Sequence, residues 1–260
     1  MLRVPMQTIE QRLLELIPEA KKLAVPPISN FYVGVVALGT SGNIYYGANQ
    51  EFPGEALSFT VHAEQAAVVN AMAHGETGLQ MLAVSAAPCG YCRQFLNELT
   101  TASTLTILRP DLPPATLASL LPHAFGPTDL GVDAALMSPQ SHGLTLDAPG
   151  ELAAAALQAA NASYAPYTRA YAGVALRARD GAIFSGSLAE NAAYNPSMSP
   201  LEAALVNLVI NGGKSYADIA EAVLVEVDGV ISQEGATRAV LRAIGDIPLV
   251  RYTSASRGKT

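Results

Sequence analysis

The only two cysteines of the 260-residue chain, Cys89 and Cys92, are separated by two residues in the stretch "APCGYCRQF". Such a pair can form a disulfide, act as a redox dithiol or supply half of a metal site. In a reducing cytoplasm a structural disulfide is the least favoured of the three. A thioredoxin-like pair needs no His-x-Glu partner, and this chain has no tryptophan to flank the thiols. The pattern therefore favours a metal site.

A histidine and a glutamate upstream, in "TVHAEQAAVV", complete a candidate metal site. His62 and the two thiolates make three ligands of the types that Zn²⁺ prefers, and catalytic zinc sites have three protein ligands plus an open position, whereas structural sites close with four. Zinc lowers the pKa of a water in that position to about 7 and so provides a hydroxide nucleophile. Glu64 is the candidate for moving the proton of this water to a substrate.

Both parts of the site are predicted to lie at helix starts. Ser58 or Thr60 is the expected N-cap of the helix that begins near His62. Pro88 closes a turn before the cysteines, and apolar residues at helical spacing follow them. Unpaired backbone N–H groups at a helix start favour thiolate over thiol, which suits metal binding.

Composition excludes several other classes of protein. The chain is 50% hydrophobic and 14% charged, as expected for a globular protein with a substantial core. A net charge of −7 without a Lys/Arg run argues against nucleic acid as a partner. No uninterrupted stretch of about 18 apolar residues occurs, so the sequence predicts no membrane span. The N-terminus has no basic start before an apolar block, so we expect a cytoplasmic protein.

Two segments repeat one pattern at an offset of 139 residues, which indicates a duplicated domain. They are "YVGVVALGTSGNIYYGANQEF" at residues 32–52 and "YAGVALRARDGAIFSGSLAEN" at residues 171–191. Each segment is typical of a β-hairpin, and in each half the chain continues with an alanine-rich helix, a strand, a helix and a strand. The matched pairs are Pro27 and Pro166, Gly34 and Gly173, Val35 and Val174, Gly42 and Gly181, Ile44 and Ile183, Gly47 and Gly186, and Glu51 and Glu190.

This order of elements predicts an α/β fold with two tandem domains, each a mixed β-sheet packed with helices. We assign residues 1–23 to an amphipathic N-terminal helix and residues 24–136 to the domain that carries the metal site. The turn-rich stretch 137–150 is the expected linker, and residues 151–260 form the second domain.

The second half keeps the repeat but lacks the chemistry. Opposite His62 and Glu64, the ungapped alignment places Leu201 and Ala203, whereas a two-residue shift places Ser199 and Leu201 there. No cysteine lies in this half. We therefore expect one zinc ion per chain, bound by the first half.

The segments "FYVGV", "GANQEF", "VHAEQAAV", "PCGYCRQFLNEL" and "AFGP", in this order, resemble cytidine deaminases of the two-domain, homodimeric type. Within them, "HAE" and "PCGYC" match the H-x-E…P-C-x-x-C signature of zinc-dependent nucleobase deaminases. The resemblance runs from about residue 24 to about residue 210. It implies hydrolytic deamination of cytidine and deoxycytidine to uridine and deoxyuridine plus ammonia, as a step of pyrimidine salvage.

The same resemblance implies roles for single residues. The three ligands named above, His62, Cys89 and Cys92, would bind zinc. Glu64 would carry protons to N3 of the pyrimidine and then to the departing ammonia. The residues implied to contact the substrate are Asn49 and Glu51 at the ribose hydroxyls, Phe31 and Phe125 at the base, and the backbone near Ala63 and Ala87 in the pocket wall.

The resemblance also implies a homodimer with shared active sites. A loop of the second domain would reach the partner's site, and here that loop would present Ala193 and Tyr194. We accordingly expect a small-molecule nucleoside substrate, and neither nucleic acid nor a membrane as partner.

Two other functions are weighed against this one. A polynucleotide cytidine deaminase would need basic and aromatic surface residues to hold a strand, and this acidic chain lacks the basic ones. A non-enzymatic zinc-binding interaction module would not need Glu64 beside an open metal position.

Overall fold

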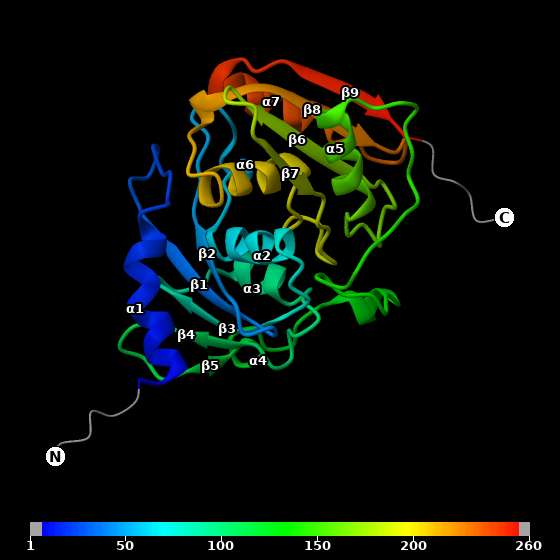
Figure 1. Cartoon of the computed structure of the whole chain (residues 1–260). Coiled ribbons are helices and arrows are strands. Elements are labelled where there is room, and N and C mark those ends of the chain that lie inside the picture. Colours follow the sequence, from blue (N-terminus) through cyan, green and yellow to red (C-terminus); the bar gives the residue numbers. More distant parts are fainter. Residues whose placement is uncertain (1–6, 255–260) are drawn as a thin grey trace.

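Two β-sheets with helices on both faces build the protein (Figure 1). The computed structural model describes residues 7–254, so residues 1–6 of the predicted N-terminal segment and residues 255–260 of the predicted second domain lie outside it. Strand order is β2-β1-β3-β4-β5 in the first sheet and β7-β6-β8-β9 in the second. The pair β3–β4 and its counterpart β8–β9 are parallel, while the other pairs are antiparallel. Both sheets are therefore mixed, and the predicted α/β fold with two tandem domains is confirmed.

Both halves share the order helix, strand, strand, helix, strand, helix, strand, and the first half continues with β5, α4 and η2. The first half contains α1 (Ile9–Lys21), β1 (Gly34–Gly39), β2 (Ile44–Ala48), η1 (Leu57–Phe59), α2 (Ala63–Ala73), β3 (Leu79–Val84), α3 (Gly90–Leu96), β4 (Thr106–Leu108), β5 (Ala115–Thr116), α4 (Leu117–Leu120) and η2 (Pro127–Leu130). The second half contains α5 (Glu151–Asn161), β6 (Ala172–Ala178), β7 (Ile183–Ser187), α6 (Pro200–Ile210), η3 (Tyr216–Asp218), β8 (Ile219–Glu226), α7 (Glu234–Gly245) and β9 (Leu249–Thr253). The stretch 137–150, predicted as a linker, contains none of these elements.

Close packing of a helix on a strand explains one glycine pair of the repeat. A Cβ on Gly47 would lie 2.4 Å from the backbone nitrogen of Ala67, and a Cβ on Gly186 would lie 2.2 Å from that of Ala204. Neither strand can therefore carry a side chain where α2 or α6 crosses it. The glycines are 139 residues apart and the alanines 137, so the helices align only after the two-residue shift. Ser199 is thus the counterpart of His62.

One apolar core crosses from the first half to the second. In β1, Val35 and Ala37 face α2, whereas Val36 and Leu38 alternate with them and face α1. The second sheet is covered in the same way, by α6 on one face and α5 on the other. Because α2 packs against α6 at the centre (Figure 1), the facing layers of both halves merge into a single core.

The central helices also cover the edges of the two sheets. Asn70 of α2 donates a hydrogen bond to the carbonyl of Tyr46 at 2.9 Å, and Asn207 of α6 donates one to the carbonyl of Ser185 at 2.8 Å. Strands β2 and β7 are both edge strands, so the carbonyls that point away from β1 and β6 have no neighbouring strand as a partner. The same device thus serves both halves.

Candidate active site

His62 itself is the N-cap of α2. The sequence predicted the cap at Ser58 or Thr60, which would have placed His62 inside the helix. That prediction was wrong. The backbone of Val61 exchanges two hydrogen bonds of 2.9 Å with Gln50, so the chain stays extended up to Val61 and the helix starts only beyond it. His62 therefore projects from the end of α2, where its ring can reach α3.

The two cysteines lie at the start of α3, as predicted. Cys89 is the N-cap, and its sulfur accepts a hydrogen bond from the backbone N–H of Cys92 at 3.4 Å. The Cys92 thiol and this N–H lower the pKa of Cys89 to about 5, because both stabilise its thiolate. One thiolate at this helix start is thus available at neutral pH.

The three predicted ligands converge. Nδ1 of His62 lies 3.5 Å from Sγ of Cys89 and 3.2 Å from Sγ of Cys92, and the two sulfurs are 3.5 Å apart. In a tetrahedral zinc site with ordinary bond lengths, ligand atoms are about 3.5 to 3.8 Å from one another. The donor types and their spacing therefore fit zinc with three protein ligands. No other His, Cys, Asp and Glu group of this kind occurs within residues 7–254.

Glu64 projects from the first turn of α2 beside these ligands. Its side chain is 4% exposed, and burial raises the pKa of the carboxyl above its ordinary value. A buried acid next to a candidate metal site can hold and release a proton without competition from bulk water.

A cavity of about 280 Å³ opens beside these groups. Most of the residues that the sequence predicted for substrate contact line it, but Phe125, Ala193 and Tyr194 do not. Phe125 lies outside this cavity, with its carbonyl accepting from Gln94 and Asn97. The lining residues are Ser29, Phe31, Val33, Asn49, Glu51, Thr60, His62, Ala63, Glu64, Ala86, Ala87 and Cys89.

Glu51 is bound to the backbone that forms one wall of this cavity. Its carboxylate accepts hydrogen bonds from the N–H of Ile28 at 2.8 Å, the N–H of Ser29 at 2.9 Å and the Ser29 hydroxyl. Burial alone would raise the pKa of Glu51, but these bonds outweigh it and hold the pKa below its ordinary value. The group is therefore an anion with part of its acceptor capacity already used.

Glu190 makes the matching contacts in the second half. It accepts from the N–H of Tyr167 at 3.0 Å, the N–H of Thr168 at 3.2 Å and the Thr168 hydroxyl. Sequence reasoning missed Ser29, although the repeat carries its signal, because residue 29 and residue 168 both bear a hydroxyl. The carboxylate and hydroxyl pair is thus part of the fold in both halves.

Asn49 has no such counterpart. Its Oδ1 accepts from the N–H of Val33 at 2.9 Å, and its Nδ2 donates to the carbonyl of Phe31 at 2.9 Å. The matching position of the second half is Leu188. Asn49 therefore distinguishes the half with the ligands from the half without them.

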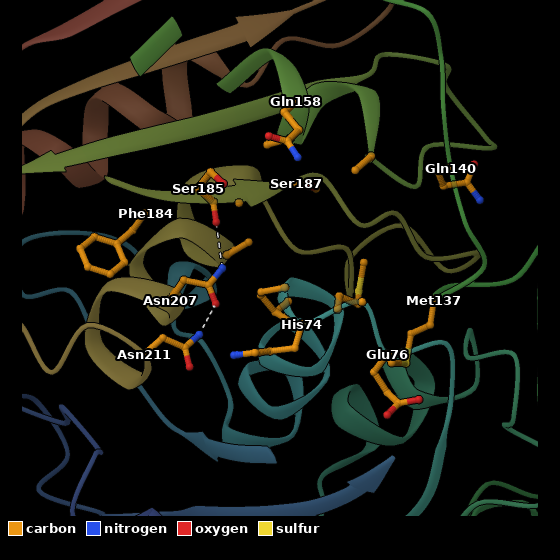
Figure 2. Close-up of a pocket in the computed structure, with 18 of the residues that line it drawn as sticks. His74, Glu76, Met137, Gln140, Gln158, Phe184, Ser185, Ser187, Asn207 and Asn211 are labelled. Atoms are coloured by element: carbon orange, nitrogen blue, oxygen red, sulfur yellow. Dashed lines mark hydrogen bonds between the residues drawn. The ribbon is translucent and has the colours of Figure 1, made fainter. Parts of the chain in front are cut away.

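A larger cavity, of about 540 Å³, lies away from this site between α2, α6 and β7 (Figure 2). Several of its polar groups already have hydrogen-bond partners. Nδ2 of Asn211 donates to Oδ1 of Asn207 at 3.0 Å, and Asn207 in turn donates to the Ser185 carbonyl. Glu76 already accepts from Thr40, Ser41 and Tyr45. This cavity is larger but offers no converging reactive groups.

Sequence comparison places the chain among known proteins. The sequence model of the family "Cytidine and deoxycytidylate deaminase zinc-binding region" matches residues 7–107, and a second model of the same description matches residues 117–238. A curated cytidine deaminase of Aeromonas hydrophila subsp. hydrophila is 52% identical over 238 residues, which cover 91% of this chain and 80% of that protein. One of Photobacterium profundum is 49% identical over 236 residues, with 90% and 80% covered.

Among solved structures, cytidine deaminase from Mycobacterium tuberculosis is 34% identical. The match covers 46% of this chain and 99% of that chain, with a TM-score of 0.43.

The chain belongs to the cytidine and deoxycytidylate deaminase family. Within that family its tandem halves make it a two-domain cytidine deaminase. The predicted enzyme class and the predicted zinc are thereby confirmed. Residues 7–254 contain no helix long and apolar enough to cross a membrane.

We expect elemental analysis of the purified enzyme to find one zinc per chain, although both halves match a zinc-binding region. His62→Ala should lose most of this zinc because it removes one of three ligands. Ser199→Ala, the matched change at the N-cap of α6, should retain it. Two zinc ions per parent chain, or zinc loss in both variants, would contradict the assignment.

Proposed function

We propose that this cytidine deaminase hydrolyses the exocyclic amino group of both cytidine and deoxycytidine, releasing ammonia, and that it serves pyrimidine salvage. The observation that carries the proposal is the buried carboxyl of Glu64, which shares one nucleoside-sized cavity with His62 and Cys89. The identity to curated cytidine deaminases supports the choice of substrate class. Cytoplasmic localisation stays a prediction, consistent with two cysteines that serve as thiols.

Zinc, when bound by His62, Cys89 and Cys92, supplies a water that is acidic enough to act as a nucleophile at neutral pH. Glu64 then holds the proton that this water gives up. The carboxyl would deliver this first proton to N3 of the pyrimidine. It would then take the second proton, from the oxygen that has become bonded to C4, and pass it to the amino group, which leaves as ammonia when the C4–N bond breaks. Because the side chain is buried, the proton is not lost to bulk solvent between these steps.

The remaining cavity residues bind and orient the nucleoside. Phe31 contacts the base, and backbone groups of Ala63 and Ala87 line its edge. Asn49 and Glu51 receive the ribose hydroxyls. A carboxylate offers about four acceptor positions, so Glu51 can take one more hydrogen bond beside the three from residues 28 and 29.

The alternatives are separated by one ultraviolet assay of the purified enzyme with cytidine, deoxycytidine, free cytosine, cytidine monophosphate and a single-stranded oligonucleotide. Turnover of the two nucleosides alone supports the proposal. A polynucleotide deaminase would act on the oligonucleotide, which the net charge of −7 disfavours. A zinc-binding interaction module would release no ammonia from any of them.

Glu64→Ala should retain zinc and lose turnover by at least roughly 10²-fold to 10⁴-fold, the usual effect of removing a general acid–base group. The loss can be larger because one carboxyl serves several proton transfers. Steady-state kinetics and elemental analysis of the same sample test this. A variant that loses its zinc, or that stays active, would show that Glu64 has another role.

Glu51→Ala should raise KM for cytidine by about 10-fold or more, because a buried polar contact to the sugar is lost. The same change also frees residues 28 and 29, so it needs a control. Glu190→Ala removes the same three contacts in the second half and should lower stability by a similar amount without changing KM. Equal KM effects of the two variants would mean that Glu51 acts only through the fold.

We further propose a homodimer in which each cavity is completed by the other chain. Phe125, Ala193 and Tyr194 do not line the cavity of their own chain, yet all three are exposed, and Tyr194 is 63% exposed. Exposed aromatic side chains are typical anchors of protein interfaces. Their exposure outside their own cavity supports a role for these three residues in the active site of a partner chain.

Complementation tests the shared site. Chains with Glu64→Ala are expected to be inactive, and chains with Tyr194→Ala to be strongly impaired. Co-expression of the two should restore part of the activity, because a mixed dimer has one catalytic half with Glu64 facing a loop with Tyr194. Sedimentation should give twice the chain mass. Failure of the mixture to exceed the Tyr194→Ala enzyme, or a monomer by sedimentation, would exclude shared sites.

A further inference from the structure

Loop 191–196 of the second half lies against α2 and α3 of the first half of the same chain. Four side chains of the first half bind this loop. Gln94 and Glu98 hold its first two residues, whereas Tyr91 and Gln65 bind its last two. Gln94 and Asn191 exchange hydrogen bonds, from Nδ2 of Asn191 to the Gln94 carbonyl at 3.0 Å and from Nε2 of Gln94 to Oδ1 of Asn191 at 3.3 Å. Asn191 is fully buried, so this exchange is shielded from water.

Glu98, also fully buried, holds the next residue of the loop. Its carboxylate accepts from the N–H of Ala192 at 3.0 Å and from the hydroxyls of Tyr164, at 2.8 Å, and Tyr167. All three donors belong to the second half. The start of the loop is therefore anchored just beyond the end of α3, through a buried carboxyl group with three hydrogen-bond partners.

Tyr91 and Gln65 connect the loop to the predicted zinc ligand His62. The hydroxyl of Tyr91 donates to the carbonyl of Asn195 at 2.8 Å, and its ring lies 5.6 Å from the ring of His62. Gln65 is buried, donates from Nε2 to the carbonyl of Pro196 at 3.2 Å, and accepts on Oε1 from the backbone N–H of His62 at 3.2 Å. Both residues thus contact His62 on one side and the second half on the other.

We propose that Gln65 and Tyr91 are positioning residues through which loop 191–196 holds His62, so that the second half controls how firmly its own chain retains zinc. Groups that orient a metal ligand raise metal affinity because the ligand no longer has to be ordered when the metal binds. The inference rests on the zinc site of the proposed function. It does not require the dimer, because all the hydrogen bonds that hold the loop are made within one chain.

The test is the rate at which the purified full-length zinc enzyme loses its metal to an excess of a chromogenic chelator. Tyr91→Phe removes the hydrogen bond to Asn195 and keeps the ring against His62, and Gln65→Met removes both bonds of Gln65. Tyr91→Phe should release zinc about 3-fold to 10-fold faster, the effect of one lost hydrogen bond, and Gln65→Met, which loses two, should release it at least as fast as Tyr91→Phe. Tyr252→Phe, at an exposed position of β9, is the matched control and should release zinc at the parent rate.

Asn191→Ala tests whether the effect passes through the loop, because it frees the loop without touching any residue next to His62. Its effect on zinc release should be less than multiplicative with that of Tyr91→Phe. The visible spectrum of the cobalt-substituted enzyme should also change in Tyr91→Phe but not in Tyr252→Phe, a signature that a loss of stability alone would not produce.

Two results would overturn the inference: release rates of Tyr91→Phe and Gln65→Met that match the Tyr252→Phe control, or fully multiplicative effects of Tyr91→Phe and Asn191→Ala. In either case the zinc site itself would stand. A parent enzyme that binds no zinc would instead refute the proposed function, and this inference with it.

Discussion

The packing of α2 against α6 is the constraint on which the rest of the structure depends. These helices are buried almost throughout, and neither half alone could cover the apolar face that they share. Since α2 also presents His62 and Glu64 at its start, the position of these two side chains depends on α6, a helix of the other half. The second half is in this sense part of the active-site scaffold.

Much of this arrangement could be predicted from sequence because its signals are local or repeated. Glycines and apolar runs at a fixed offset indicated the duplicated hairpins, and the strands of both repeats have the same register. The cysteine pair with an upstream His-x-Glu identified the ligands, since few other chemistries require that set. Two strong patterns therefore gave both the fold class and the metal.

The remaining features depend on contacts that no local pattern encodes. The N-cap of α2 is His62 because Val61 pairs with Gln50, a bridge between segments that are separate in sequence. Gln65 and Tyr91 donate hydrogen bonds to backbone carbonyls. Since every residue has a backbone carbonyl, no residue type in the sequence marks these contacts. The resemblance implied that Phe125 contacts the base, yet this residue does not line the cavity of its own chain.

The second half keeps some features of the first half and lacks others. Glu190 still binds its own loop, and Gly186 still admits α6, whereas Ser199 and Leu201 stand where ligand and acid stand in the first half. Each chain thus carries an internal control. A contact made in both halves, such as that of Glu51 and Glu190, serves the shared fold whatever else it does, whereas a residue that only one half has, such as Asn49, is not required by that fold.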